Sequence, residues 1–184
     1  SRGVDRSFCL YYNITVLYNS VMHGGKTAST AGQTTLDLIY QAAMEEFLDK
    51  GFKSASLRNI VKTAGVTTGA FYGYFDSKEA LFEALVQEQY DWMLDCFRKA
   101  QREFADLPQQ EQPDQLGTIS GVCMYDMLLY AYEHLEKFKL ILCHSEGTRF
   151  SDLIDTMVEI ETKGTHDYLE VLKKLGRPAP PIDE

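Results

Sequence analysis

The sequence predicts an all-α protein in which a three-helix head is followed by a longer helical body. Apolar residues recur at steps of three and four through most of the chain after residue 33, which is the spacing of one helix face. Serine or threonine precedes several of these runs and glycine follows them, and these residue types begin and end helices. No segment after residue 33 has the pattern of a strand.

Length and composition describe a folded, acidic protein. The 184 residues allow one or two domains. A content of 45% hydrophobic and 24% charged residues is typical of a globular chain and argues against a disordered one. The net charge of −9 argues against a protein that coats nucleic acid nonspecifically. Residues 34–80 hold five basic and six acidic residues, so most of the acidity lies elsewhere.

Residues 1–33 are interpreted as an N-terminal extension that derives from cloning or from upstream translation. Their apolar run from Phe8 to Met22 follows Arg2 and Arg6, a layout that also resembles a signal peptide. The run is short for a membrane span and contains polar residues. An extra helical or β-prone arm and a true signal peptide are the alternatives.

The first helix of the head is predicted to begin at Thr34 or Thr35 and to end at Gly51, because threonine caps helix starts and glycine closes helix ends. Its apolar residues share a spacing of three and four positions, which places them on one face. This face consists of Leu36, Ile39, Tyr40, Ala43, Met44 and Phe47.

Two shorter helices follow, joined by a turn at Gly65. Ser56 is predicted to cap the second helix and Thr67 the third. Gly65 supplies the positive φ that a tight turn between two helices needs. We place Tyr74 and Phe75 in the core of the head, next to the third helix.

A fourth, much longer helix is expected to start after Asp76, with Glu79 completing a capping box. It should end at Leu107, because Pro108 follows. The remaining body helices are predicted at about 115–133, at 136–147, and from 151 to 175 before Gly176.

Two short helices joined by a glycine turn are the sequence form of a helix-turn-helix. The segments AAMEEF with KGF, SLRNIVKTAGVTTGAFYGYF and SKEAL, in that order, resemble the DNA-binding domain of the TetR family of bacterial transcriptional regulators. The resemblance covers about a quarter of the chain. It implies a helix-turn-helix DNA-binding domain at 34–80 and a helical ligand-binding and dimerisation domain at 81–184.

The same resemblance implies a cytoplasmic homodimer with no membrane contact, a repressor that a small-molecule inducer releases from double-stranded operator DNA. Bodies in this family continue into two further helices beyond the point where this chain stops, so we expect either a truncated C-terminus or a body without those helices. A weak dimer is then expected to use residues 8–22 or the last long helix. The apolar positions of that helix are Ile154, Val158, Tyr168 and Leu172.

The third helix of the head is the expected recognition helix. Small outward side chains let a helix approach base edges in the major groove, and a tyrosine hydroxyl can reach a phosphate. Lys78 adds a positive charge at a helix N-terminus, which already favours anions. The predicted DNA-binding residues are Thr67, Thr68, Gly69, Tyr72, Gly73 and Lys78, with Thr35, Ser56 and Arg58 as weaker candidates.

Methionine and aromatic residues on converging faces predict a mostly apolar ligand cavity between the three long body helices. Plain core packing is the competing interpretation for most of these residues. The candidate ligand-binding residues are Trp92, Met93, Cys96, Tyr125, Met127, Leu128, Phe138, His144 and Tyr168.

No enzyme is predicted. The chain has no glycine-rich phosphate loop and no serine nucleophile elbow, and its four histidines lack metal-ligand spacing, so no catalytic residue, metal or cofactor is expected. The four cysteines form no CxxC pair, which favours reduced thiols. An all-helical ligand-sequestering or protein-interaction module without operator binding is the alternative function.

Overall fold

The computed structural model describes residues 34–178, which form helices and connecting turns without any strand. The predicted all-α fold class is confirmed. Within this range no helix is long and apolar enough to cross a membrane. The extension predicted at 1–33 lies outside the described residues.

The described residues form two compact units. The first unit contains residues 34–92 and 134–153, and the second contains 93–133 and 154–178. Helix α5 (Lys78–Ala105) runs through both units, so the domain boundary predicted after residue 80 lies inside a helix.

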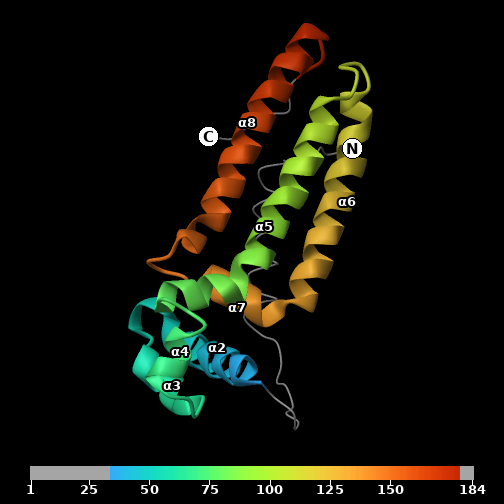
Figure 1. The fold of residues 1–184 in the computed structure, drawn as a ribbon. Coiled ribbons are helices and arrows are strands. Elements are labelled where there is room, and N and C mark those ends of the chain that lie inside the picture. Colours follow the sequence, from blue (N-terminus) through green and yellow to red (C-terminus); the bar gives the residue numbers. More distant parts are fainter. Residues whose placement is uncertain (1–33, 179–184) are drawn as a thin grey trace. The chain divides into compact units, whose positions relative to one another are not determined.

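Helices from two parts of the sequence make up the first unit. They are α2 (Thr35–Ser54), α3 (Leu57–Thr63), α4 (Thr68–Tyr72), the start of α5, α7 (Leu135–Cys143) and the 3-10 helix η1 (Arg149–Asp152) (Figure 1). Three predicted caps are confirmed, because the hydroxyl oxygens of Thr34, Ser56 and Thr67 accept backbone N–H bonds at the starts of α2, α3 and α4. Gly51 and Gly65 have φ angles of 73° and 68°, which glycine adopts without strain.

The predicted cap of α5 is wrong by one residue. The hydroxyl oxygen of Ser77, not the carboxylate of Asp76, accepts the backbone N–H of Ala80 at 3.1 Å. With Ser77 as the cap, Glu79 is only the second residue of the helix and stands too early to complete a capping box. Aspartate and serine are both good capping residues. Which of Asp76 and Ser77 caps α5 therefore depends on the path of the chain after α4.

Tyr74 was expected in the core, and this prediction is also wrong. Its side chain is 50% exposed, whereas Phe71 is fully buried and Phe75 is 8% exposed, as predicted for Phe75. The reason is that α4 ends at Tyr72 with Gly73 as its C-cap. The helical spacing that groups Tyr74 with Phe71 therefore no longer applies at residue 74.

Aromatic rings form the centre of the first unit. The rings of Phe47 and Phe52 both meet Phe82 edge-on, with centroids 5.1 and 5.2 Å apart, and Phe150 lies 6.0 Å from Phe82. All four rings are buried. Edge-to-face pairs contribute about 0.5–1.5 kcal/mol each beyond the burial of their area, so this cluster joins α2, α5 and η1.

Glu46 ties α2 to the start of α3. Its carboxylate accepts hydrogen bonds from the Lys50 ammonium at 2.9 Å, the Ser56 backbone N–H at 2.9 Å and the Asn59 amide at 3.4 Å. The side chain is only 12% exposed. Burial alone would raise the pKa of Glu46, but the hydrogen bonds from Ser56, Lys50 and Asn59 outweigh burial, and the pKa is lowered.

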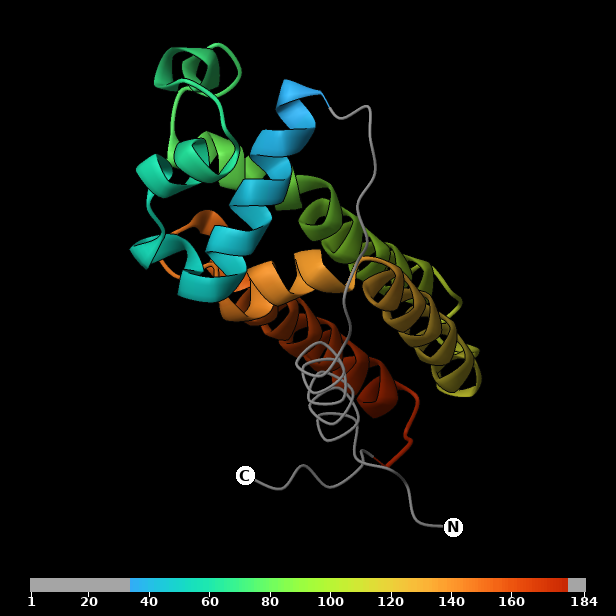
Figure 2. The same ribbon diagram turned by 90° about the horizontal axis from the view of Figure 1, so that it is seen from below.

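The second unit consists of the rest of α5 together with α6 (Gln112–Glu133) and α8 (Leu153–Lys174), which lie side by side in both views (Figures 1 and 2). Helix α6 begins three residues earlier than predicted. The buried Gln112 donates from its amide to the carbonyls of Ala105 and Leu107 at 3.4 and 3.2 Å. It therefore satisfies carbonyls at the end of α5, and the predicted loop is shorter.

The exposed apolar face of the second unit lies mainly on α6 and not on α8. Val158 of α8 is exposed as predicted, but Leu172 is only 4% exposed. On α6 the exposed large apolar side chains are spaced three, four and three residues apart, which places them on one face. They are Val122, Tyr125, Leu129 and Tyr132.

Glycines inside the long helices give a first prediction. At Gly117 and Gly121 of α6 an added Cβ would meet no atom within 4 Å, whereas at Gly164 of α8 it would clash with the Gln101 amide oxygen. Replacing Gly117 or Gly121 with alanine should raise the free energy of unfolding by about 0.5–1 kcal/mol each, because glycine loses more backbone entropy in a helix. Gly164→Ala should give no such gain. Urea unfolding followed by circular dichroism measures all three, and an equal gain at Gly164 would contradict the close packing of Gln101.

Glu46 gives a second prediction. Because its pKa is lowered in the folded chain from an ordinary value of 4.5, its contribution to stability is complete above about pH 4.5 and disappears as the pH falls through the folded-state pKa. Glu46→Gln should cost about 1 kcal/mol near neutral pH and progressively less toward pH 3. The matched control is Glu45→Gln, one residue earlier and exposed. A cost that does not change with pH in urea unfolding would refute this role.

Candidate nucleic-acid interface and ligand cavity

Helix α4 presents an exposed face because one buried side chain anchors its other face. Phe71 is fully buried, and its ring lies 5.8 Å from the buried ring of Phe75 and 5.4 Å from the ring of Tyr72. The Tyr72 side chain itself is 52% exposed. The helix is thus fixed from within while its outer surface stays accessible.

The structure brings together the recognition residues that the sequence predicts. All of them are exposed: Thr67, Thr68, Gly69, Tyr72 and Gly73. An added Cβ at Gly73 would lie 3.2 Å from the Ala70 carbonyl oxygen, so glycine lets the chain turn closely after α4. Apart from Tyr72 these side chains are small, and a helix with a small-residue surface can approach base edges in the major groove. Tyr74 adds a second exposed ring that the sequence analysis had assigned to the core.

Lys78 has internal partners that the sequence analysis missed. Its ammonium donates to the carbonyls of Phe52 and Ala55 at 2.7 and 3.0 Å and lies 4.5 Å from the centre of the Phe52 ring. These two hydrogen bonds hold the start of α5 against the end of α2. They use two of the three N–H donors of the ammonium. Contact of Lys78 with a DNA phosphate stays a prediction.

The weaker phosphate candidates are scattered over the head. Ser56 caps α3 and Thr35 is the first residue of α2, both half-buried, while Arg58 is exposed on α3. Lys62 is a further exposed cation on α3 that the sequence analysis did not select. Its position four residues after Arg58 places both cations on one helix face, and this spacing was the available signal.

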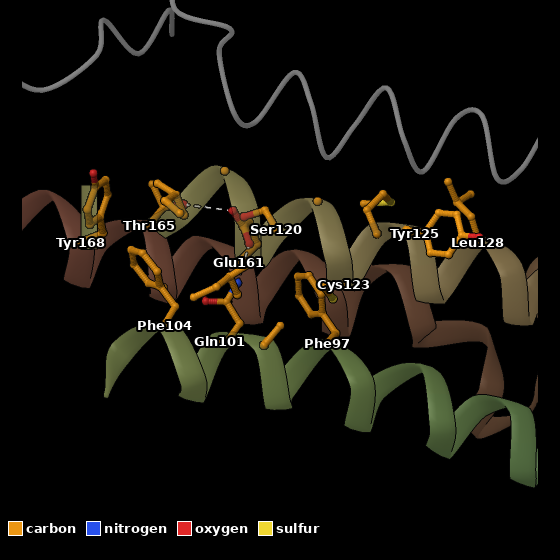
Figure 3. A pocket seen from close by; sticks show the side chains of 17 residues that line it. Phe97, Gln101, Phe104, Ser120, Cys123, Tyr125, Leu128, Glu161, Thr165 and Tyr168 are labelled. Carbon is orange, nitrogen blue, oxygen red and sulfur yellow. Dashed lines mark hydrogen bonds between the residues drawn. The ribbon is translucent and has the colours of Figure 1, made fainter. Parts of the chain in front are cut away.

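The second unit contains the predicted cavity between α5, α6 and α8, with a volume of about 500 Å³ (Figure 3). Its lining is mainly apolar and aromatic. The lining residues are Phe97, Ala100, Gln101, Phe104, Leu116, Gly117, Ile119, Ser120, Gly121, Cys123, Met124, Tyr125, Leu128, Glu161, Gly164, Thr165 and Tyr168.

Only some of the predicted ligand residues line this cavity. Tyr125, Leu128 and Tyr168 do. The others do not: Met93, Cys96 and Met127 belong to the same unit outside the lining, and Trp92, Phe138 and His144 belong to the other unit. Met93 and Met127 are core residues, 0% and 3% exposed. Burial lowers the pKa of His144, and its carbonyl accepts the Phe52 N–H at 2.8 Å.

Polar groups of the cavity gather around one carboxylate. Glu161 of α8 accepts a hydrogen bond from the Gln101 amide of α5 at 2.7 Å and from the Thr165 hydroxyl at 3.5 Å. Figure 3 shows Gln101 and Glu161 next to each other, between Phe104 and Phe97. The sequence does not reveal these polar residues as a pair, because their hydrogen bond joins two helices and spans 60 residues of the chain.

The cysteines of the described part, Cys96, Cys123 and Cys143, are not joined in disulfides. Burial, with smaller effects from neighbouring groups, raises the pKa of Cys123 to about 12. Burial also raises the pKa of Cys96 and of Cys143. Thiols with raised pKa values stay protonated at neutral pH and react slowly, so none of them is a candidate nucleophile.

Comparisons with known proteins agree with the geometry of the first unit. The family described as "Bacterial regulatory proteins, tetR family" matches residues 39–85. This span contains α3, the turn at Gly65 and α4, which together form the helix-turn-helix.

Several relatives are named as helix-turn-helix regulators. The HTH-type transcriptional repressor KstR2 of Mycolicibacterium smegmatis is 26% identical over 117 residues, which cover 64% of this chain and 52% of the relative. The HTH-type transcriptional regulator UidR of Escherichia coli is 39% identical over 70 residues, 38% of this chain and 36% of the relative. The probable HTH-type transcriptional regulator YttP of Bacillus subtilis is 31% identical over 121 residues, 66% of this chain and 54% of the relative.

The chain thus spans about half or less of the length of these relatives, between 36% and 54%. Of these three relatives, UidR has the highest identity, over the shortest match. The family match covers residues 39–85. Together with the helix-turn-helix geometry, these matches show that residues 39–85 form a domain of the tetR family of bacterial regulatory proteins.

Proposed function

We propose that this chain is a transcriptional repressor that reads double-stranded operator DNA with helix α4 and releases it when a small molecule enters the cavity. The observation that carries the proposal is the exposed face of α4, held from behind by the buried Phe71 inside the span that matches the family. A recognition helix needs this combination of a fixed position and an accessible surface.

The chemistry of α4 supports readout in the major groove. Thr68 can hydrogen-bond a base edge or contact a thymine methyl, and Gly69 allows close approach of the backbone. The Tyr72 hydroxyl and the exposed Arg58 and Lys62 are suited to phosphate oxygens on either side, and such contacts position a protein without reading sequence.

The proposal includes self-association of the chain as a homodimer. Residues 34–80 carry few basic residues, so one head alone should bind DNA weakly. A homodimer places two heads on half-sites about 34 Å apart and makes the second contact effectively intramolecular. The exposed apolar side chains of α6 that do not line the cavity form the surface we assign to pairing with a second copy. They are Val122, Leu129 and Tyr132.

Substitutions in the head distinguish residues that read bases from residues that contact phosphates. Thr68→Arg should change which operator bases are preferred, with an effect of about 1–3 kcal/mol per altered base pair. Tyr72→Phe should weaken binding to all sequences by about three- to tenfold and leave stability unchanged, since it removes one hydrogen bond. Mobility-shift titration at fixed salt measures both. Unchanged affinity and preference in both variants would remove α4 from the interface.

Lys78→Ala should reduce both stability and DNA binding, unlike the substitutions on α4. Because this ammonium satisfies the carbonyls of Phe52 and Ala55, its loss should lower the free energy of unfolding by about 1–3 kcal/mol as well as weakening DNA binding. Lys62→Ala, at an exposed position, should weaken binding without affecting stability. Urea unfolding and mobility shift on the same samples separate these outcomes. Full stability of Lys78→Ala would contradict its structural role.

The proposed function as a whole is tested on the DNA next to the gene. Sequence-dependent binding that weakens as salt rises is expected for a repressor, because counterions are released from phosphates. Competition by unrelated DNA at equal strength, or no binding at all, would favour the ligand-sequestering or protein-interaction alternative.

A further inference from the structure

We infer that the ligand of the cavity is a lipophilic organic cation, with an amine, guanidinium or onium group carried on an aromatic or aliphatic frame. This assignment rests on the proposed function only for its regulatory consequence. Binding itself is argued from the charge, the hydrogen-bond geometry and the rings of the cavity.

Charge is the first argument. Among the described residues that line the cavity, Glu161 is the only aspartate, glutamate, lysine, arginine or histidine. A carboxylate in apolar surroundings acts over a longer range than it does in water. Its negative charge is among the smaller causes, after burial, of the raised pKa of the Cys123 thiol on the opposite helix. The lining therefore favours a positive charge and disfavours a negative one.

The hydrogen-bond geometry is the second argument. Gln101 donates its amide N–H to the Glu161 carboxylate at 2.7 Å, so the carboxylate is held in place and the amide oxygen of Gln101 remains an acceptor. Glycine at residue 164 leaves room for this arrangement, because an added Cβ there would clash with that oxygen unless the Gln101 side chain shifted. An ion or polar group that enters here meets two neighbouring acceptors, which suits a ligand with N–H donors or a full positive charge.

Aromatic rings supply the third argument. Phe97 and Phe104 of α5, Tyr125 of α6 and Tyr168 of α8 all line the cavity, and the rings of Phe104 and Tyr168 lie 5.3 Å apart edge-on. Ring faces attract cations, more strongly where water is excluded. The remaining aliphatic lining suits an apolar frame, and about 500 Å³ is within the usual range for small-molecule sites.

A matched pair of probes tests the assignment. Tetraphenylphosphonium and tetraphenylborate have nearly the same shape and opposite charge. Calorimetric titration of the full chain at neutral pH should show tighter binding of the phosphonium. Glu161→Gln, which keeps the shape of the side chain, should weaken phosphonium binding about tenfold and strengthen borate binding, since it removes the charge from the cavity.

Two further variants complete the design. Glu159→Gln removes the same charge from an exposed position of α8 and should change neither affinity, which controls for the acidity of the whole protein. Ser120→Lys adds a cation at an exposed position of the cavity rim on α6 and should weaken phosphonium binding without altering Glu161. The second variant also decides the matter if Glu161→Gln fails to fold.

The assignment is overturned if borate binds wild type as tightly as phosphonium does, or if Glu161→Gln and Glu159→Gln have equal effects. It is also overturned if Ser120→Lys leaves phosphonium binding unchanged. A mobility shift with and without the phosphonium keeps the proposed function separate. Glu161-dependent binding that leaves the DNA complex intact supports the cation assignment and contradicts regulation. Specific DNA binding without any Glu161-dependent probe binding supports the DNA-binding role and contradicts the cation assignment.

Discussion

A helix of five residues cannot hold itself together in water, so the position of α4 depends on the burial of Phe71. The Thr67 cap supplies one hydrogen bond, at 3.1 Å to the Ala70 N–H, and Gly65 supplies the turn before it. Neither fixes the direction in which the helix faces. The contact between the rings of Phe71 and Phe75 does, because rotation of α4 would expose a large apolar ring. The exposed face at Thr68, Gly69 and Tyr72 is therefore a consequence of where Phe71 is buried.

Polar groups then set the spacing of the helices around this anchor. Glu46 holds the start of α3 through the Ser56 N–H, and Lys78 holds the end of α2 through two carbonyls. Each of these charged groups serves backbone atoms that a helix terminus leaves unpaired. A surface ion pair such as Lys53 with Glu146, at 2.9 Å and with both side chains more than 70% exposed, contributes far less to stability. Within the first unit, partly buried charges and phenylalanine rings therefore hold the helices together more than exposed ion pairs do.

Local features of this chain could be predicted from the sequence, and features that depend on distant contacts could not. The caps at Thr34, Ser56 and Thr67 involve atoms three residues apart, so residue types alone indicate them. The α5 cap was assigned to Asp76 instead of Ser77, and Tyr74 was assigned to the core, because both depend on where α4 ends. Among the cavity residues, Tyr125, Leu128 and Tyr168 were predicted, but Trp92, Phe138 and His144 belong to the other unit. Helix α5 serves both units, and its apolar spacing does not reveal which turn faces which core.

The shared helix also limits how a ligand could act on DNA binding. Lys78 at the start of α5 holds the end of α2 in the first unit, while Gln101 and Phe104 of the same helix line the cavity in the second. Helix α5 is continuous where the described chain passes from the first unit to the second. A ligand shifts the equilibrium between DNA-bound and DNA-free protein only if it binds one arrangement of α5 more tightly than another. We propose that a cation held between Glu161 and the ring of Phe104 would do so, because its contacts would lie on α8 and α5 together and would change if the two helices moved against each other.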